Sequence, residues 1–355
     1  MDSYFIRYPD GVIRNELKCT CFWGGYFSTV LQNGALVQHL STLFERIQTE
    51  YPQQKFLFFM PQSDGDILLA EYRYLLSETY LADLRDTGVK IVIGTVAQRF
   101  SSGFREADVE YLFLPQDDHI FQYGLRSHFI LENLPKWSDR IPQIFWRGSG
   151  SRRTLPAEEE DSGFKRREVV AKLIENPAAD VRFVNNWVYP ADKIPEEWIS
   201  PSITYWHFTN YKMVLIVDGN GISSAHTWCF GIGAVPFLVT NNTFWFSDLL
   251  VPFENYIPVK YDLSDLEEKI EWVLEHDTEA REIAERASEF AYRIFTPEYQ
   301  SEYLYSRFRN LLFNDLQNNS QEIISEKKTW NDLSDEYYEK LNENGLLSFS
   351  FTNEL

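Results

Sequence analysis

The sequence predicts an α/β protein with two parallel sheets. Short apolar runs rich in β-branched and aromatic residues alternate with longer amphipathic stretches, a pattern typical of repeated βα units. The apolar runs lack polar alternation, as expected for strands that are covered on both faces. Because 355 residues are long for one core, we expect two domains. The segment LPKWSDRIPQ at 134–143, with two prolines and mixed charge, is the predicted boundary between them.

The apolar runs and the helical patterns give the expected order of elements. Eight runs are expected to form buried strands: FLFFM (56–60), VKIVIG (89–94), EYLFLP (110–115), QIFWRG (143–148), VRFVN (181–185), YKMVLIVDG (211–219), AVPFLV (234–239) and YIPV (256–259). Helical periodicity is expected at roughly 35–50, 69–86, 165–175, 223–232, 265–275 and 278–294. The expected units are an N-terminal domain over 1–140, a second domain over 141–310, and a terminal helix with an acidic tail over 311–355.

Composition and charge exclude several classes of function. With 33 Lys and Arg against 53 Asp and Glu, the formal net charge is -20, which argues against binding to nucleic acid or to anionic membranes. No apolar run reaches the ~18–20 residues that cross a bilayer, and the start of the chain lacks a signal-peptide pattern. Three cysteines (Cys19, Cys21 and Cys229) are too few for a disulfide framework or a zinc site. We therefore expect a cytoplasmic protein without a transmembrane segment.

A purely basic segment follows one of the predicted strands in this acidic chain. FWRGSGSRR at 145–153 carries Arg147, Arg152 and Arg153 and no acidic residue. Glycines let a ligand approach the backbone closely, serines donate hydrogen bonds, and arginines offer forked donors that match phosphate. The alternative is a solvated loop whose arginines pair with the acidic segment 158–161. Composition favours anion binding over this alternative.

A second candidate loop lies within VLIVDGNGISSA at 214–225. Asp218 ends a predicted strand, a Gly-Asn-Gly turn follows, and Ser223 or Ser224 is expected to cap a helix. The free backbone N–H groups at such a helix start attract phosphate. The third glycine of Gly-x-Gly-x-x-Gly is absent, so the dinucleotide-binding pattern does not apply. A plain structural turn stays an equal alternative.

Acidic residues follow two strands of the first half. Asp64 and Asp66 come after the run at 56–60, and Asp118 comes after the run at 110–115. A carboxylate at the edge of a cleft can deprotonate a hydroxyl acceptor as a general base, although single acids in such loops are more often turn or cap residues. The Asp64-Gly-Asp66 triplet also matches an Asp-x-Asp metal site. Phosphate-binding loops in one half and acids in the other indicate a transferase for a nucleotide-linked group.

Three segments resemble glycosyltransferase family 90 in order and spacing. They are FWRGSGSRR, YKMVLIVDGNGISSA and ENYIPVKYDLSDLEEKIEWVLEHDTEAREIAERASEF. The resemblance implies a GT-B-like architecture, in which two Rossmann-like domains with parallel sheets face each other across a cleft. It also implies an inverting enzyme that needs no metal or other cofactor. Such an enzyme moves xylose or glucose from a UDP-sugar to a hydroxyl of a glycan or glycoconjugate acceptor.

The same resemblance assigns roles to residues of this chain. Asp64 is the expected catalytic base, with Asp66 and Asp118 as rivals. The expected donor-binding residues are Arg147, Ser149, Arg152, Asp218, Gly219, Gly221, Ser223, Ser224 and His226. The family usually has an arginine after the two serines, where this chain has Ala225 followed by His226. Two alternatives therefore stay open: a non-catalytic glycan- or protein-binding relative of the fold, and a metal-dependent nucleotide-sugar transferase that uses Asp64 and Asp66.

Overall fold

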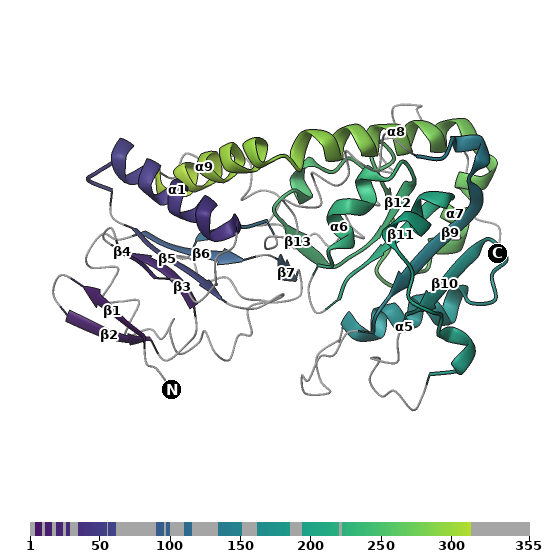
Figure 1. Ribbon diagram of the computed structural model, residues 1–355, viewed down its shortest axis with the longest axis horizontal. Helices are drawn as coiled ribbons and strands as arrows, with labels where there is room; N and C mark the ends of the chain where they lie inside the picture. The colour runs from purple at the N-terminus through teal and green to yellow at the C-terminus, as the bar shows by residue number, and fades with distance from the viewer. Residues whose placement is uncertain are drawn as a thin grey trace.

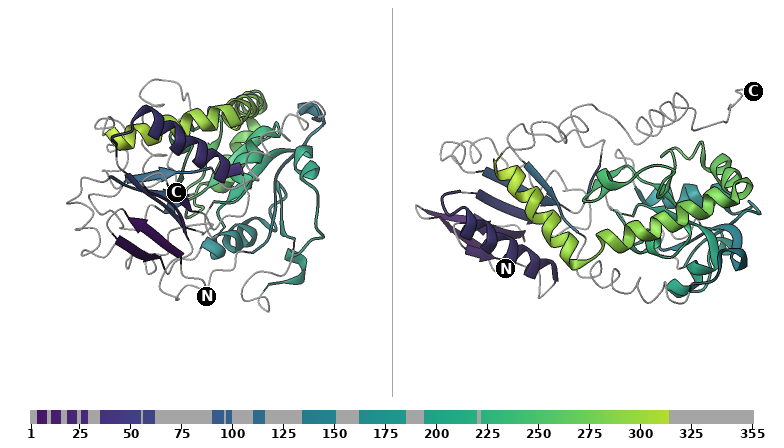
Figure 2. Two further views of the ribbon diagram at one scale, coloured as in Figure 1. Left: turned by 60° about the vertical axis from the view of Figure 1, so that its left-hand side comes forward. Right: turned by 90° about the horizontal axis from the view of Figure 1, so that it is seen from above.

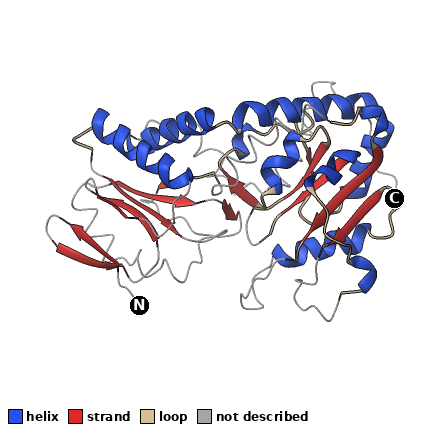
Figure 3. Cartoon of the chain, viewed as in Figure 1, coloured by secondary structure: helices blue, strands red, loops and turns tan. Residues whose placement is uncertain are grey.

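Two five-stranded sheets lie side by side along the long axis of the molecule in the computed structural model (Figure 1). Helices cover the sheets, and two short two-stranded pairings complete the β-structure of the described residues (Figure 3). The structure describes residues 4–8, 11–15, 19–23, 26–28, 35–54, 56–61, 90–95, 97–99, 110–115, 134–150, 162–184, 194–219 and 222–313.

The sheet of the second half is entirely parallel, as predicted. Its strand order is β10-β9-β11-β12-β14. The chain therefore begins at β9, adds β10 beside it at one edge, and then adds β11, β12 and β14 in turn toward the other edge. The two central strands after β9 are buried along almost their whole length, which explains their unbroken apolar sequences. The strands are β9 (Ile141–Gly148), β10 (Ala179–Phe183), β11 (Tyr211–Val217), β12 (Val235–Val239) and β14 (Ile257–Pro258).

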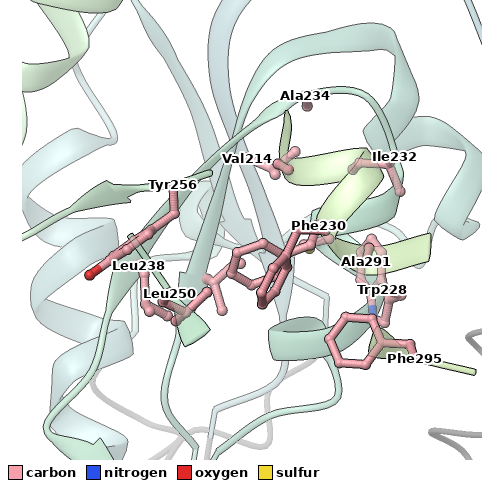
Figure 4. Close-up of a cluster of buried hydrophobic side chains, with 14 of the residues drawn as sticks. Val214, Trp228, Phe230, Ile232, Ala234, Leu238, Leu250, Tyr256, Ala291 and Phe295 are labelled. Carbon is pink, nitrogen blue, oxygen red and sulfur yellow. The ribbon is translucent and has the colours of Figure 1, made fainter. Parts of the chain in front are cut away.

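Each face of this sheet carries its own hydrophobic core. Val214 and Ile216 of β11 face one core, which is shown in part in Figure 4, and Met213 and Leu215 face the other. Alternate side chains of a strand point to opposite faces, so one apolar strand can supply both cores. The helices over the sheet are α5 (Ser162–Leu173), α6 (Ala225–Trp228), α7 (Leu266–Glu275) and α8 (Asp277–Ile294).

The sheet of the first half is mixed rather than parallel throughout, which corrects the expectation of two parallel sheets. Its order is β4-β3-β5-β6-β8, with β5, β6 and β8 parallel and the β3–β4 hairpin antiparallel. Gly24 and Gly25 separate the two hairpin strands in the sequence, and a two-residue connection can join only antiparallel strands. The strands are β3 (Cys19–Trp23), β4 (Tyr26–Ser28), β5 (Phe56–Pro61), β6 (Lys90–Thr95) and β8 (Glu110–Phe113). A separate hairpin is formed by β1 (Tyr4–Tyr8) and β2 (Gly11–Asn15).

The end of the described chain returns to the first half. Helix α9 (Pro297–Phe313) follows α8 and lies beside α1 (Ala35–Glu50), as the views in Figure 2 also show. Phe308 of α9 packs against Phe44 of α1 and Phe56 of β5, with ring centroids 5.6 and 4.9 Å away. A helix from beyond the second sheet thus completes the core of the first sheet.

A second connection joins the two halves near the centre of the molecule. Strand β13 (Asn242–Phe244), from the second half, pairs antiparallel with β7 (Ala97–Arg99) from the first. The expected helix at 69–86 and the tail beyond residue 313 lie outside the described residues. No helix within the described ranges is both long and apolar enough to span a bilayer.

Candidate functional site

The strand order creates a topological switch point between β9 and β11. The chain leaves β9 toward β10 on one side, and β11 begins the run to β12 and β14 on the other side. In open parallel sheets of this order, ligands bind outside the carboxyl ends of the strands at this point. Ser149 follows β9 directly, and Asp218 and Gly219 follow β11 directly. The structure therefore brings the first residues of the two candidate loops, Ser149 and Asp218, together at one place.

Arg166 of α5 joins the ends of these two strands. Its Nε donates to the carbonyl of Asp218 at 2.8 Å, and its Nη1 donates to the carbonyl of Ser149 at 2.7 Å. Its Nη2 makes a longer bond of 3.4 Å to the carbonyl of Val217. Burial lowers the pKa of Arg166 to about 10, although the charge of Asp218 works in the opposite direction. Even so, Arg166 carries its positive charge at neutral pH.

Sequence reasoning missed Arg166 because nothing local marks it. It lies in the KRR run at 165–167, which the sequence analysis included only as part of an amphipathic helix. Its partners are backbone carbonyls in segments 17 and 52 residues away, and these contacts depend on the strand order. The one available signal is an arginine at the start of the helix that follows the basic segment.

The carboxylate of Asp218 points into the protein. Its side chain is fully buried, and Oδ2 accepts hydrogen bonds from Thr240 Oγ1 at 2.9 Å, from the Asn241 backbone N–H at 3.0 Å and from Asn242 Nδ2 at 2.7 Å. Asn242 begins β13, the strand that pairs with the first half. Asp218 therefore fixes the end of β11 at the junction of the two halves.

His226 connects Asp218 to Ser223. The ring of His226 is fully buried, and its Nε2 lies 3.1 Å from Asp218 Oδ1. Its Nδ1 accepts a hydrogen bond from the Ser223 backbone N–H at 3.1 Å and lies 3.1 Å from the Ser223 hydroxyl. The same Nδ1 also lies 3.1 Å from the Ser223 carbonyl oxygen, so the ring is held against the N–H, the hydroxyl and the carbonyl of Ser223. Asp218 and His226 thus support the turn from the interior, and half-buried Ser223 lies at its surface.

The helix after this turn differs from the expected capped helix. Helix α6 covers only Ala225–Trp228 and continues as a 3-10 turn over Cys229–Gly231. Ser224 occupies the N-cap position, but its side chain makes no capping hydrogen bond, and the Ser223 N–H is taken by His226. The prediction of a serine-capped helix is therefore wrong. A four-residue helix also has a small dipole, so α6 adds little to any attraction of an anion to this turn.

The side chain of Arg147 extends from β9 to the neighbouring strand β10. Its Nη2 lies 2.6 Å from Asp180 Oδ1, and its Nη1 donates to the carbonyl of Asp180 at 2.8 Å. The guanidinium also lies 4.5 Å from the centre of the Phe145 ring, and 8% of the side chain is exposed. Arg147 precedes the last residue of β9, so strand alternation directs it over a sheet face and not beyond the strand end. Its charge is balanced by Asp180.

Several predicted site residues lie outside the described residues. They are Asp64, Asp66, Asp118, Arg152 and Gly221. Their roles stay predictions, as does the donor role of the described residues. Within the described ranges, no group of three His, Cys, Asp or Glu side chains is arranged to hold a metal ion.

Comparison with known proteins gives the family. The sequence model of glycosyl transferase family 90 matches residues 127–324, more than half of the 355-residue chain. The chain belongs to glycosyl transferase family 90. The matched range contains the whole parallel sheet and both candidate loops, so the switch point lies within the part of the chain that matches the family.

Relatives of this family 90 chain include viral and vertebrate proteins. Uncharacterized protein 179R of Invertebrate iridescent virus 6 is 30% identical over 182 residues, which cover 43% of this chain and 15% of that protein. Protein O-glucosyltransferase 2 of Danio rerio is 30% identical over 159 residues, which cover 44% of this chain and 30% of that protein. The chain thus matches less than a third of the length of these relatives.

Solved structures with a distant likeness were also found. Sucrose-phosphate synthase from Thermosynechococcus elongatus matches with a TM-score of 0.42 and 11% identity, covering 79% of this chain and 72% of that chain. HepE of Anabaena in complex with UDP matches with a TM-score of 0.39 and 10% identity, covering 79% and 76%. The α/β class expected for this family 90 chain is confirmed by its own two sheets.

Proposed function

We propose that the chain is an inverting, metal-independent glycosyltransferase. It transfers xylose or glucose from a UDP-sugar to a hydroxyl of a glycan or glycoconjugate acceptor. Membership of family 90 supports this proposal, and a relative named protein O-glucosyltransferase 2 supports glucose as one donor sugar. The observation that carries it is the meeting of the ends of β9 and β11, where both candidate loops begin, at the switch point of a parallel sheet.

In the proposed reaction, an acceptor oxygen displaces UDP from the anomeric carbon in one step. A bond forms between the acceptor oxygen and the anomeric carbon while the bond from that carbon to the diphosphate oxygen breaks. The proton of the acceptor hydroxyl passes to Asp64, with Asp66 and Asp118 as the rival bases. UDP leaves from the opposite face with the bonding electrons, so a single displacement inverts the anomeric centre.

The proposed donor site uses the two loops in different ways. Ser149 follows β9, and Gly219, Ser223 and Ser224 follow β11, so these residues are the proposed contacts of the diphosphate. Arg152 and Gly221 are proposed as further contacts from the sequence alone. Asp218 and His226 are fully buried and act by holding the turn. Arg147 contributes only if it exchanges its bonds to Asp180 for bonds to a phosphate. Donors aimed at the departing diphosphate stabilise the charge that develops on it.

Calorimetric titration of UDP into the purified protein in EDTA tests the proposal. We expect binding at micromolar strength, unchanged when excess manganese replaces EDTA. UDP-xylose and UDP-glucose are then compared for turnover to identify the donor sugar. Binding that requires manganese would instead support the metal-dependent transferase that uses Asp64 and Asp66. The absence of binding under both conditions would contradict the proposal and support the non-catalytic relative, for which Ala225 is the sequence feature.

A further inference from the structure

Two arginines are almost completely buried at opposite ends of the parallel sheet. Arg166 lies at the carboxyl ends of the strands, and Arg140 directly precedes β9 at the amino ends. Arg140 donates to the carbonyls of Pro135 at 3.2 Å and Ile232 at 3.1 Å. Among the described residues neither arginine forms an ion pair within salt-bridge distance. The two side chains thus share burial and carbonyl binding, but only Arg166 lies at the switch point.

We infer that Arg166 is the positioning residue that adapts the switch-point site to a diphosphate. This inference rests on the proposed function, because it concerns the same donor site. One guanidinium binds the carbonyl of Ser149 after β9 and the carbonyls of Val217 and Asp218 at the end of β11. One rigid group thus links the two strand ends beyond the last paired residues of β9 and β11.

The Arg166 guanidinium also has N–H groups beyond those that bind the strand ends. An arginine has five N–H groups, and the three bonds at the strand ends use three of them. The other two, one on each terminal nitrogen, have no acceptor within the described ranges. Gly219 lies against this group, since a Cβ at that position would be 2.9 Å from Nη2. Only a residue without a side chain leaves the guanidinium this close to the turn.

Charge gives Arg166 a second effect on an anionic ligand. Asp218 is fully buried beside it, and an uncompensated carboxylate there would repel a diphosphate at the strand ends. The positive charge of Arg166 offsets this repulsion in a region from which water is excluded. Removing Arg166 should therefore weaken binding of the diphosphate more than binding of the nucleoside. A residue that only stabilised the fold would weaken both alike.

Lysine cannot fully replace arginine at this position. Its ammonium group is a compact charge with three donors, and it lacks the planar fork that spans two strand ends. Arg166→Lys keeps the charge and loses the geometry, whereas Arg166→Met loses both. Comparing the two variants therefore separates the effect of the positive charge, which offsets Asp218, from the effect of the planar guanidinium, which spans the two strand ends.

The experiment compares the affinities of UDP and uridine in EDTA for the parent protein, Arg166→Lys, Arg166→Met and the control Arg140→Met. We expect the ratio of UDP to uridine affinity to fall about tenfold in Arg166→Met, less in Arg166→Lys, and not at all in Arg140→Met. Arg140→Met should lower the midpoint of thermal unfolding about as much as Arg166→Met does, because it removes a similarly buried guanidinium.

Two results overturn this inference while leaving the proposed function intact. One is an unchanged affinity ratio in Arg166→Met, or in Arg166→Lys if the methionine variant does not fold. The other is an equal fall of the ratio in Arg140→Met. If the parent protein itself does not bind UDP, the proposed function fails first, and this inference fails with it.

Discussion

His226 and Asp218 meet side chain to side chain in the interior, with Nε2 3.1 Å from Oδ1 and neither side chain exposed. The contact joins the end of β11 to the first turn of α6, and the Ser223 N–H completes it on the other side of the ring. The turn at the switch point is therefore held by buried polar groups. Such groups cost free energy when they lose a partner.

Replacing His226 should destabilise the protein and weaken donor binding together. His226→Ala leaves the Ser223 N–H without its acceptor and removes the ring that lies against Asp218 Oδ1, at a cost of about 1–3 kcal/mol in the free energy of unfolding. Urea unfolding measures this change, and UDP titration measures the effect on the turn. The exposed His207 gives the control, because His207→Ala should change the stability by less than about 0.5 kcal/mol. Equal effects of the two substitutions would contradict the structural role of His226.

A second prediction concerns stability in acid. Burial by itself would raise the pKa of Asp180, but the hydrogen bond and charge of Arg147, the hydrogen bond of Tyr211 and the charge of Arg182 together lower the pKa below its ordinary value. Tyr211, whose own pKa is raised to about 12 by burial and by Asp180, also donates to the carboxylate. A carboxyl with a lower pKa in the folded state stabilises the fold above its unfolded pKa, and this contribution is lost as the pH falls through the folded pKa.

Asp180→Asn should therefore lower the free energy of unfolding at pH 7, on the order of 3 kcal/mol, because Arg147 is left buried without its counter-charge. The difference from the parent protein should shrink as the pH falls from about 4, the ordinary pKa of an aspartate, toward the lower pKa that Asp180 has in the folded protein. Urea unfolding at pH 7 and pH 3 measures both values. Glu285, in an exposed pair with Arg281, is the control, and Glu285→Gln should have little effect at either pH. A difference that stays constant with pH would exclude this account.

The packing of α9 gives a third prediction. Phe308 is fully buried among Phe44, Phe56 and Phe58, which belong to the first half of the chain. Phe308→Ala should lower the free energy of unfolding by about 3–5 kcal/mol, because it leaves a cavity in that core. Leu274→Ala, at a position that is 37% exposed on α7, should cost far less. A small effect of Phe308→Ala in urea unfolding would mean that α9 is not part of the first core.

The sequence predicted elements that have a local pattern, but not the contacts between distant elements. The helices at 35–50 and 278–294 agree with α1 and α8 almost to the residue, because apolar spacing directly reflects which helix face is buried. Each candidate loop begins where a strand ends, at Ser149 and at Asp218, although Arg147 of the basic segment lies within β9. The proximity of these two strand ends was not predictable, since strand order depends on tertiary packing. Arg166 and Arg147 have partners in other elements for the same reason, and no local pattern identifies those partners.

The β3–β4 hairpin, in contrast, had a local signal. Gly24-Gly25 lies between the apolar runs CTCFW and YFS, a combination typical of two short strands joined by a tight turn. Neither run was among the expected strands, although CTCFW is as long as FLFFM and VRFVN, which were. A three-residue pattern such as YFS does not distinguish a strand from a loop until a neighbouring strand provides its hydrogen bonds.

The last prediction concerns the catalytic base, which the sequence analysis assigned to Asp64. Asp64→Asn keeps the shape of the side chain and removes its ability to accept a proton, so kcat should fall about 100- to 10,000-fold. UDP affinity should not change, because the proposed base contacts the acceptor and the donor is held by the loops after β9 and β11. Asp66→Asn and Asp118→Asn are the matched controls and should retain most of the activity. If one of these controls loses activity and Asp64→Asn does not, that residue is the base. A loss of UDP binding in Asp64→Asn would instead mean that this loop reaches the donor, and the division of roles between the two halves would be wrong.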